Sequence, residues 1–267
     1  MKLCRCSHAG GISWGILEET TIALLAGPPF EKIERTGVSV PLAQARLLAP
    51  CEPSKILGVG LNYRAHAEEM KKPIPSRPLM FLKPLTAIVG PGEPIRLPLE
   101  SCEVHHEAEL AVVVARTMKR VSPAQAREGV LGFTCFNDVT ARDIQRAEVQ
   151  YTRAKGFDTF APFGPVIETE LDPKKQLVKA LVNGEVRQLG NTSDMIFDVY
   201  ELLSFVSRGM TLLPGDVLTT GTPPGVGPLA AGDVVEVSVE GVGVLRNPVL
   251  AEEDQASAAP LGRPAAG

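Results

Sequence analysis

Aromatic side chains are scarce in this sequence: they make up 5% of its 267 residues, with a single tryptophan. The core must therefore depend on valine, leucine, isoleucine and alanine. Hydrophobic residues at 44% and charged residues at 22% exclude a mostly disordered chain. Positive charge is not in excess either, because the net charge is −4. Nucleic acid, which is usually bound by basic proteins, is therefore not an expected partner.

Long apolar runs are also missing. No run approaches the ~18 residues that a membrane span needs, and residues 1–10 lack the apolar segment of a signal peptide. The five cysteines are scattered and odd in number, which does not fit a disulfide framework. We therefore expect a cytoplasmic protein without membrane contact. There is no Walker loop, and the Gly-x-Gly at residues 58–60 lacks the third glycine of a dinucleotide site.

Turn-forming residues, by contrast, are abundant, with 25 glycines and 23 prolines. Residues 1–50 predict a small β-rich N-terminal domain, with strands at 12–17 and 21–25. Residues 51–250 predict the main domain. Residues 251–267, rich in alanine, proline and glycine, predict a mobile tail.

Within the main domain, the pattern of apolar residues predicts mostly strands. Strands are expected at 56–60, at 110–115, where both faces are apolar, and at 234–239, where apolar and polar residues alternate. Helices are expected at 123–130, 139–149 and 196–208. A shorter helix, with Asn62 as its cap, precedes a stretch broken by prolines, so residues 62–78 are a candidate lid.

Two glutamates stand out at the start of the apolar run. Glu107 and Glu109 are two residues apart, so in a strand both side chains point to the same face. Adjacent carboxylates repel each other and resist burial, and a divalent cation removes both problems. The alternative is a solvent-facing pair on an edge strand.

A third carboxylate, Asp138, follows another apolar stretch and precedes a predicted helix. It is either a helix cap or a hard oxygen ligand. Together with Glu107 and Glu109 it would suit Mg²⁺ or Mn²⁺, with water or substrate oxygens completing an octahedron.

Three further features are candidates for catalysis or substrate binding: a histidine–glutamate pair, a lysine and a Gly/Pro loop. His66 and Glu69 lie three residues apart, on one face of the predicted helix, and a carboxylate beside an imidazole raises its basicity. Lys155 could hold a substrate carboxylate or an enolate oxygen. The Gly/Pro loop at 220–228, which includes Thr222, could bind an anion through its backbone N–H groups. Each has an ordinary alternative: a surface pair, an exposed lysine and a simple turn.

In order along residues 51–250, these segments resemble the fumarylacetoacetate hydrolase family. The matching motifs are Gly60-Leu61-Asn62-Tyr63 with His66 and Glu69, Phe81-Leu82-Lys83-Pro84, His106-Glu107-Ala108-Glu109-Leu110, Asn137-Asp138-Val139-Thr140-Ala141-Arg142-Asp143, Arg153-Ala154-Lys155-Gly156-Phe157-Asp158, Asn191-Thr192-Ser193-Asp194-Met195-Ile196 and Thr220-Gly221-Thr222-Pro223.

The resemblance implies an α+β fold that is mainly β, a mixed β-sandwich roll decorated by helices and forming a homodimer. It implies Mg²⁺ or Mn²⁺, with Ca²⁺ as an occupant in crystals. The site residues that it implies are metal ligands Glu107, Glu109 and Asp138, catalytic residues His66, Glu69 and Lys155, and substrate contacts Arg64, Lys83, Gln145 and Thr222.

The chemistry implied by the resemblance passes through the enolate of a 2-oxo acid. Our first hypothesis is a hydrolase or lyase that cleaves a C–C bond in 1,3-dicarbonyl 2-oxo acids of the acylpyruvate or oxaloacetate type. The second is an isomerase or tautomerase of 2-hydroxymuconate-type diacids (5-carboxymethyl-2-hydroxymuconate or 2-hydroxyhepta-2,4-diene-1,7-dioate), as in aromatic catabolism. A catalytically silent binding protein with the same fold is the third.

Overall fold

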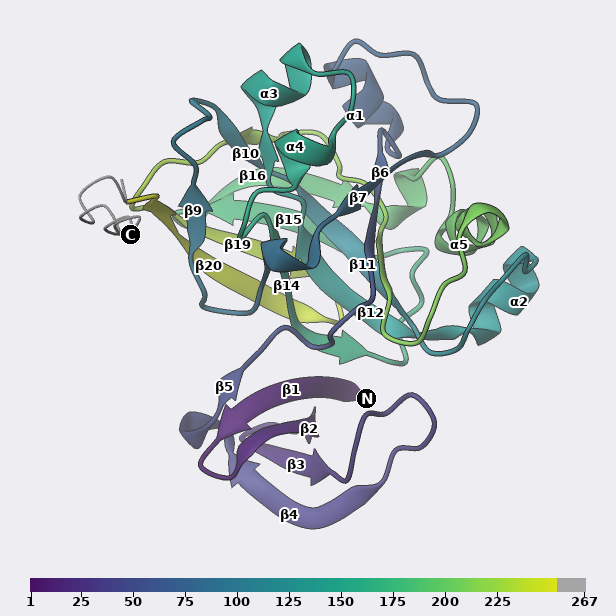
Figure 1. Ribbon diagram of the computed structural model, residues 1–267, viewed down its shortest axis with the longest axis vertical. Coiled ribbons are helices and arrows are strands. Elements are labelled where there is room, and N and C mark those ends of the chain that lie inside the picture. The colour runs from purple at the N-terminus through teal and green to yellow at the C-terminus, as the bar shows by residue number, and fades with distance from the viewer. Residues whose placement is uncertain (254–267) are drawn as a thin grey trace, which may run out of the picture.

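Two large β-sheets face each other across the main core, and the first five strands extend one of them at the N-terminal end (Figure 1). The computed structural model describes residues 1–253. The expected mainly β fold is confirmed. Side chains from both sheets meet in one buried cluster, with Leu110 and Val112 from the first sheet and Ala180 and Val237 from the second.

The first sheet runs from the N-terminal strands to the strands that carry the site. Its order is β4 (Arg35–Pro41), β3 (Thr21–Leu25), β2 (Gly11–Leu17), β1 (Lys2–His8), β14 (Ala161–Glu168), β12 (Val130–Asn137), β11 (Ala108–Val114), β17 (Val217–Thr219), β6 (Ile56–Gly60) and β7 (Leu79–Lys83). Strands β5 (Arg46–Leu47) and β8 (Ile88–Val89) pair with β1 and β14. Because β1 pairs with β14, hydrogen bonds join the N-terminal strands to the rest of the sheet. The predicted domain division after residue 50 stays a prediction.

Two further sheets complete the β structure. The second sheet has the order β16 (Glu185–Asn191), β15 (Leu177–Val182), β19 (Val234–Val239), β20 (Gly243–Ala251) and β9 (Ile95–Leu97). A small sheet near the site contains β13 (Thr140–Ala141), β10 (Val104–His106) and β18 (Gly227–Pro228).

The helices are short and lie outside the sheets (Figure 1). They are α1 (Arg64–Glu69), α2 (Pro123–Glu128), α3 (Arg142–Ala147), α4 (Thr152–Lys155) and α5 (Val199–Gly209), with 3-10 turns η1 (Leu42–Gln44), η2 (Leu85–Ala87) and η3 (Thr192–Asp194). In the described residues, no helix is both long and apolar enough to cross a membrane. All five cysteines are free thiols.

The predicted strands are confirmed, including the burial of β11 on both faces and the alternation along β19. Three helix predictions were wrong at their starts. The helix expected from residue 139 begins at Arg142, because residues 140–141 pair with β10. The helix expected from residue 196 begins at Val199, because Asp198 caps it and Glu201 completes a capping box.

The third correction concerns Asn62, which does not cap α1. Its side chain instead donates to the backbone oxygens of Phe197 and Thr220 and accepts from the Phe197 N–H, so it ties the start of α1 to distant loops. The predicted tail also began too early, because Ala251 is the last residue of β20 and pairs with Leu97. Residues 254–267 of that tail lie outside the described residues.

Candidate metal centre and active site

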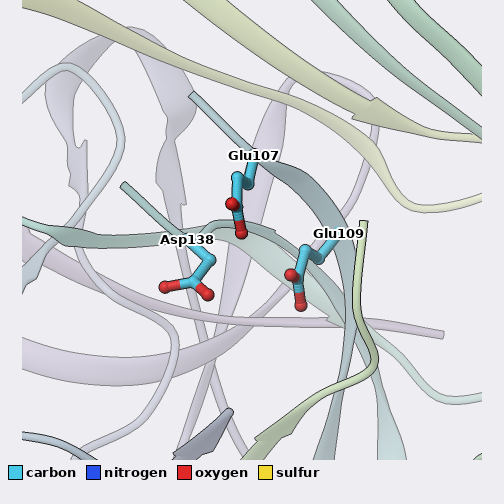
Figure 2. Close-up of side chains that lie close together, drawn as sticks. All are labelled: Glu107, Glu109 and Asp138. Carbon is cyan, nitrogen blue, oxygen red and sulfur yellow. The ribbon is translucent and has the colours of Figure 1, made fainter. Parts of the chain in front are cut away.

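Three buried carboxylates meet where two central strands of the first sheet lie side by side. Glu109 is in β11, Glu107 immediately precedes this strand, and Asp138 immediately follows β12. Because Ala108 is paired with Asn137, the antiparallel register brings these positions together. One carboxylate oxygen from each residue lies within 4.8 Å of the other two, and Figure 2 shows the three side chains close together.

Burial decides between the alternatives that the sequence left open. Glu107, Glu109 and Asp138 are 5%, 1% and 1% exposed, so the solvent-facing glutamate pair is wrong. Asp138 does not cap α3, whose N-cap is Ala141 and has no side-chain hydrogen bond. Three carboxylates that share a buried space are a hard-oxygen donor set, and they fit Mg²⁺ or Mn²⁺.

Cationic side chains surround two of these carboxylates. The ammonium group of Lys155 donates to Glu107 Oε2 (2.9 Å), to Asp138 Oδ2 and to the Thr140 hydroxyl (2.9 Å). Lys83 donates to the other oxygen of Asp138. The exposed-lysine alternative for Lys155 is therefore wrong, since the residue is 2% exposed.

Glu109 differs from its neighbours because no lysine or arginine among the described residues pairs with it. Its Oε2 instead accepts from the backbone N–H of Gly221 (2.9 Å). Burial, followed by the charges of Asp138 and Glu107, raises the pKa of Glu109 well above its ordinary value. Burial alone would also raise the pKa of Glu107, but Arg142 and Lys155 outweigh it and hold that pKa below its ordinary value. A bound divalent cation would relieve the repulsion at Glu109.

The histidine–glutamate pair lies on α1. Nδ1 of His66 is 3.0 Å from Glu69 Oε2, as the three-residue spacing predicted. His66 is 4% exposed, so the surface-pair alternative is wrong for the imidazole, while the Glu69 side chain is 35% exposed. The other oxygen of Glu69 accepts from the backbone N–H of Gly225 (2.9 Å). The dyad is therefore attached to the 220–228 loop.

One cavity is lined both by His66 of the dyad and by two of the three carboxylates. It occupies about 460 Å³, and its lining includes His66, Glu107, Glu109, Lys155 and Thr222. A small molecule in this cavity would therefore contact a base, two candidate metal ligands and an ammonium group together.

Comparison with known proteins shows the family to which this chain belongs. Residues 55–250 match the family model described as Fumarylacetoacetate (FAA) hydrolase C-terminal. The chain belongs to the fumarylacetoacetate hydrolase family. Residues 1–50 match a second model, Rv2993c-like, N-terminal.

Relatives of this chain are found both in mycobacteria and in a mammal. Protein Rv2993c of Mycobacterium tuberculosis is 46% identical over 260 residues, which cover 94% of this chain and 98% of the relative. The mitochondrial oxaloacetate tautomerase FAHD2A of Bos taurus is 43% identical over 79% of this chain and 71% of its own. The crystal structure of 5-carboxymethyl-2-hydroxymuconate delta-isomerase from Mycobacterium smegmatis is 47% identical, with a TM-score of 0.90 over 94% of this chain and all of its own.

Only some of the substrate contacts that the family resemblance implied line the cavity. Gln145 lines the cavity and accepts from Arg142 (2.7 Å). The structure does not bring Arg64 to the cavity: its side chain is exposed and the cavity lining excludes it. Lys83 is buried against Asp138 and does not line the cavity either, so in this arrangement it contacts a candidate metal ligand.

Thr222 is in the cavity wall, but its hydroxyl is already engaged. It donates to the backbone oxygen of Ala108 (2.8 Å) and accepts from Gln188 Nε2 (2.8 Å). Because a hydroxyl has a single hydrogen, Oγ1 can only accept from a ligand here. A substrate carboxylate at this loop would need a backbone N–H as its donor.

Two residues were absent from the predicted site. Arg142, at the start of α3, donates to Glu107 and is 4% exposed. Its three-residue spacing from Gln145 on a helix was the available signal. Gln188 contacts Thr222 from β16, and no local motif marks it.

Proposed function

We propose that the protein is a divalent-metal-dependent enzyme that moves a proton on the enolate of a dicarboxylic 2-oxo acid, as a tautomerase or isomerase. The observation that carries this proposal is the shared cavity, which is lined by His66, the partner of Glu69, and by the carboxylates of Glu107 and Glu109. The named reactions of the bovine and Mycobacterium smegmatis relatives support proton transfer over bond cleavage.

Glu107, Glu109 and Asp138 would hold Mg²⁺ or Mn²⁺. The bound cation would supply Lewis-acid stabilisation of the negative charge that develops on the substrate's 2-oxygen. His66 engages Glu69 through Nδ1, which leaves Nε2 to take a proton from one substrate atom and return it to another.

The charges of the cavity wall support an anionic substrate. Its lining contains four lysine and arginine side chains and three glutamates: Lys72, Arg142, Arg146, Lys155, Glu107, Glu109 and Glu148. These side chains carry a formal net charge of +1, and a divalent cation would raise it to +3, which favours a ligand with two carboxylates over a ligand with one.

Cleavage of a C–C bond is the second candidate. The same dyad could activate water for attack on a second carbonyl of an acylpyruvate, with pyruvate enolate as the leaving group. Oxaloacetate in its keto form could lose CO₂, and the electron pair of the broken C–C bond would then form pyruvate enolate. The buried, oriented imidazole of His66 is the observation that favours this reaction.

One experiment separates these reactions. The purified protein is incubated with Mg²⁺ or Mn²⁺ and a panel of oxaloacetate enol, muconate-type dienols and acylpyruvates. A change in ultraviolet absorption without pyruvate supports the tautomerase or isomerase, whereas release of pyruvate supports cleavage. Tight binding of Mn²⁺ without turnover of any compound would identify a silent binding protein.

The homodimer implied by the family resemblance is proposed here as well. Leu79, Leu82 and Leu85, on or just after β7, are 40%, 45% and 45% exposed, and such apolar surface is typical of a protein interface. We expect light scattering to give twice the monomer mass and Leu82→Glu to reduce it. A monomeric wild-type protein would contradict the proposal.

A further inference from the structure

A buried amide lies on an otherwise exposed stretch of β16. Gln188 is 0% exposed, whereas Val186 and Leu189 on the same strand are 58% and 57% exposed. Burying an amide costs free energy unless its donors and acceptors are paired. The contacts of Gln188 therefore indicate what this residue does.

All the hydrogen-bonding groups of the amide have partners. Oε1 accepts from the backbone N–H of Ala108 (2.9 Å) and lies 3.0 Å from Nδ1 of His106. Nε2 donates to the backbone oxygen of Pro223 (2.7 Å) and to Thr222 Oγ1 (2.8 Å). The two backbone partners, one donor and one acceptor, fix the orientation of the amide. Gln188 thus joins the start of β11 to the 220–228 loop.

That loop supports the two halves of the candidate site. The N–H of Gly221 donates to Glu109 Oε2, and the N–H of Gly225 donates to Glu69 Oε1, both at 2.9 Å. The segment between these two donors contains Thr222 and Pro223, which Gln188 holds.

Close packing keeps β16 and the loop together. A Cβ atom added to Gly190 would lie 2.3 Å from Pro223 Cβ, and one added to Gly225 would lie 2.3 Å from the backbone oxygen of Arg187. Gly225 also has φ +96°, a conformation that favours glycine. The loop therefore has little room to shift while the amide contacts remain.

We propose that Gln188 is a positioning residue: it fixes residues 221–225 so that two backbone N–H groups orient Glu109 and Glu69. Gln188 is not among the residues that line the cavity or form the carboxylate cluster, so it would act through the loop. Its effects on turnover and on metal affinity rest on the proposed function, but its effect on the loop does not.

The test replaces Gln188 with methionine, which keeps the length of the side chain and removes all four contacts. Three quantities are measured: the exchange rates of the Gly221 and Gly225 amides in the metal-free protein, Mn²⁺ affinity by calorimetry, and kcat and KM on whichever panel compound is turned over. We expect faster exchange of both amides, Mn²⁺ affinity about tenfold weaker and kcat lowered more than KM is raised. Val186→Thr, on the exposed face of the same strand, is the matched control and should change none of these.

A double mutant separates positioning from a general loss of packing. With Glu69→Gln already present, Gln188→Met should lower kcat by a smaller factor than in the wild-type background, since part of its effect passes through Glu69. Unchanged amide exchange and Mn²⁺ affinity in a folded Gln188→Met protein would overturn the proposal, as would an equal loss of kcat in both backgrounds. If Gln188→Met does not fold, Gln188→Glu, which keeps the Ala108 contact, decides by the same criteria. If no compound is turned over, amide exchange and Mn²⁺ affinity still decide.

Discussion

The two halves of the candidate site are held in different ways. The carboxylates are attached to adjacent central strands; Lys83, Lys155 and Arg142 donate to Glu107 and Asp138, and the Gly221 N–H donates to Glu109. The dyad lies on a helix of six residues, and Glu69, 35% exposed, is held to the protein body by the N–H of Gly225. The three carboxylates Glu107, Glu109 and Asp138, called the floor below, are thus held mainly by buried donors, whereas Glu69 has, among the described residues, only the Gly225 N–H besides its contact with His66. The lid at residues 62–78 stays a prediction.

The largest loss of metal binding and activity is expected from a substitution among the three carboxylates of the floor. Asp138→Asn removes one of three charges from the candidate metal site and leaves Lys83 and Lys155 opposite a neutral amide. We expect Mn²⁺ binding to be lost in calorimetry and kcat/KM to fall by about a thousandfold or more. Asp143→Asn, whose carboxylate contacts Ser101 and Cys102 outside the site, is the control. Retained Mn²⁺ binding in Asp138→Asn would show that the floor is not a metal site.

The next largest effect should separate the helix from the floor. His66→Ala removes the base without touching a carboxylate of the floor. We expect kcat to fall by about a hundredfold to a thousandfold, and Mn²⁺ affinity to stay within about twofold of wild type. Wild-type kcat in His66→Ala would remove the imidazole from the mechanism, and a large loss of Mn²⁺ affinity would show that the two halves are not independent.

A smaller loss is expected from the outer member of the dyad. Glu69→Gln keeps the shape and the contact with Gly225 but removes the charge that holds the imidazole. We expect kcat to fall by at least about tenfold, but by less than for His66→Ala, because the amide NH₂ that then faces Nδ1 favours the imidazole tautomer with a proton on Nε2. Glu68→Gln, exposed on the same helix, should have wild-type kinetics. An equal loss of kcat in Glu69→Gln and Glu68→Gln would show that Glu69 has no specific role in orienting His66.

The same comparison explains what the sequence could predict. Glu107 with Glu109 and His66 with Glu69 are local patterns, because side-chain direction repeats every two residues in a strand and about every three or four in a helix. Contacts between distant segments have no such pattern. Asp138 and Lys83 are 55 residues apart, Gln188 and Thr222 are 34 apart, and both pairs meet because of strand order.

Local signals also failed where tertiary contacts competed with them. Asn62 is a good helix cap by residue type, but its amide forms three hydrogen bonds with Phe197 and Thr220 instead. The helix expected from residue 139 lost its first turn to the pairing of β13 with β10. In each case the competing partner lies far away in the sequence, so no window around the residue could reveal it.

The smallest predicted effect is a pH dependence confined to the floor. The raised pKa of Glu109, caused by burial and then by Asp138 and Glu107, means that the metal-free protein holds a proton there at pH values where an ordinary glutamate is ionised. A metal ion must displace this proton, so Mn²⁺ affinity should rise with pH, by at most about tenfold per unit for one proton, and level off above the pKa of Glu109. Calorimetry in buffers with different ionisation enthalpies should detect up to one proton released per Mn²⁺. Because no charge of α1 is among the main causes of this shift, His66→Ala should release the same number of protons, and a different number would mean that the helix helps to set the charge state of the floor.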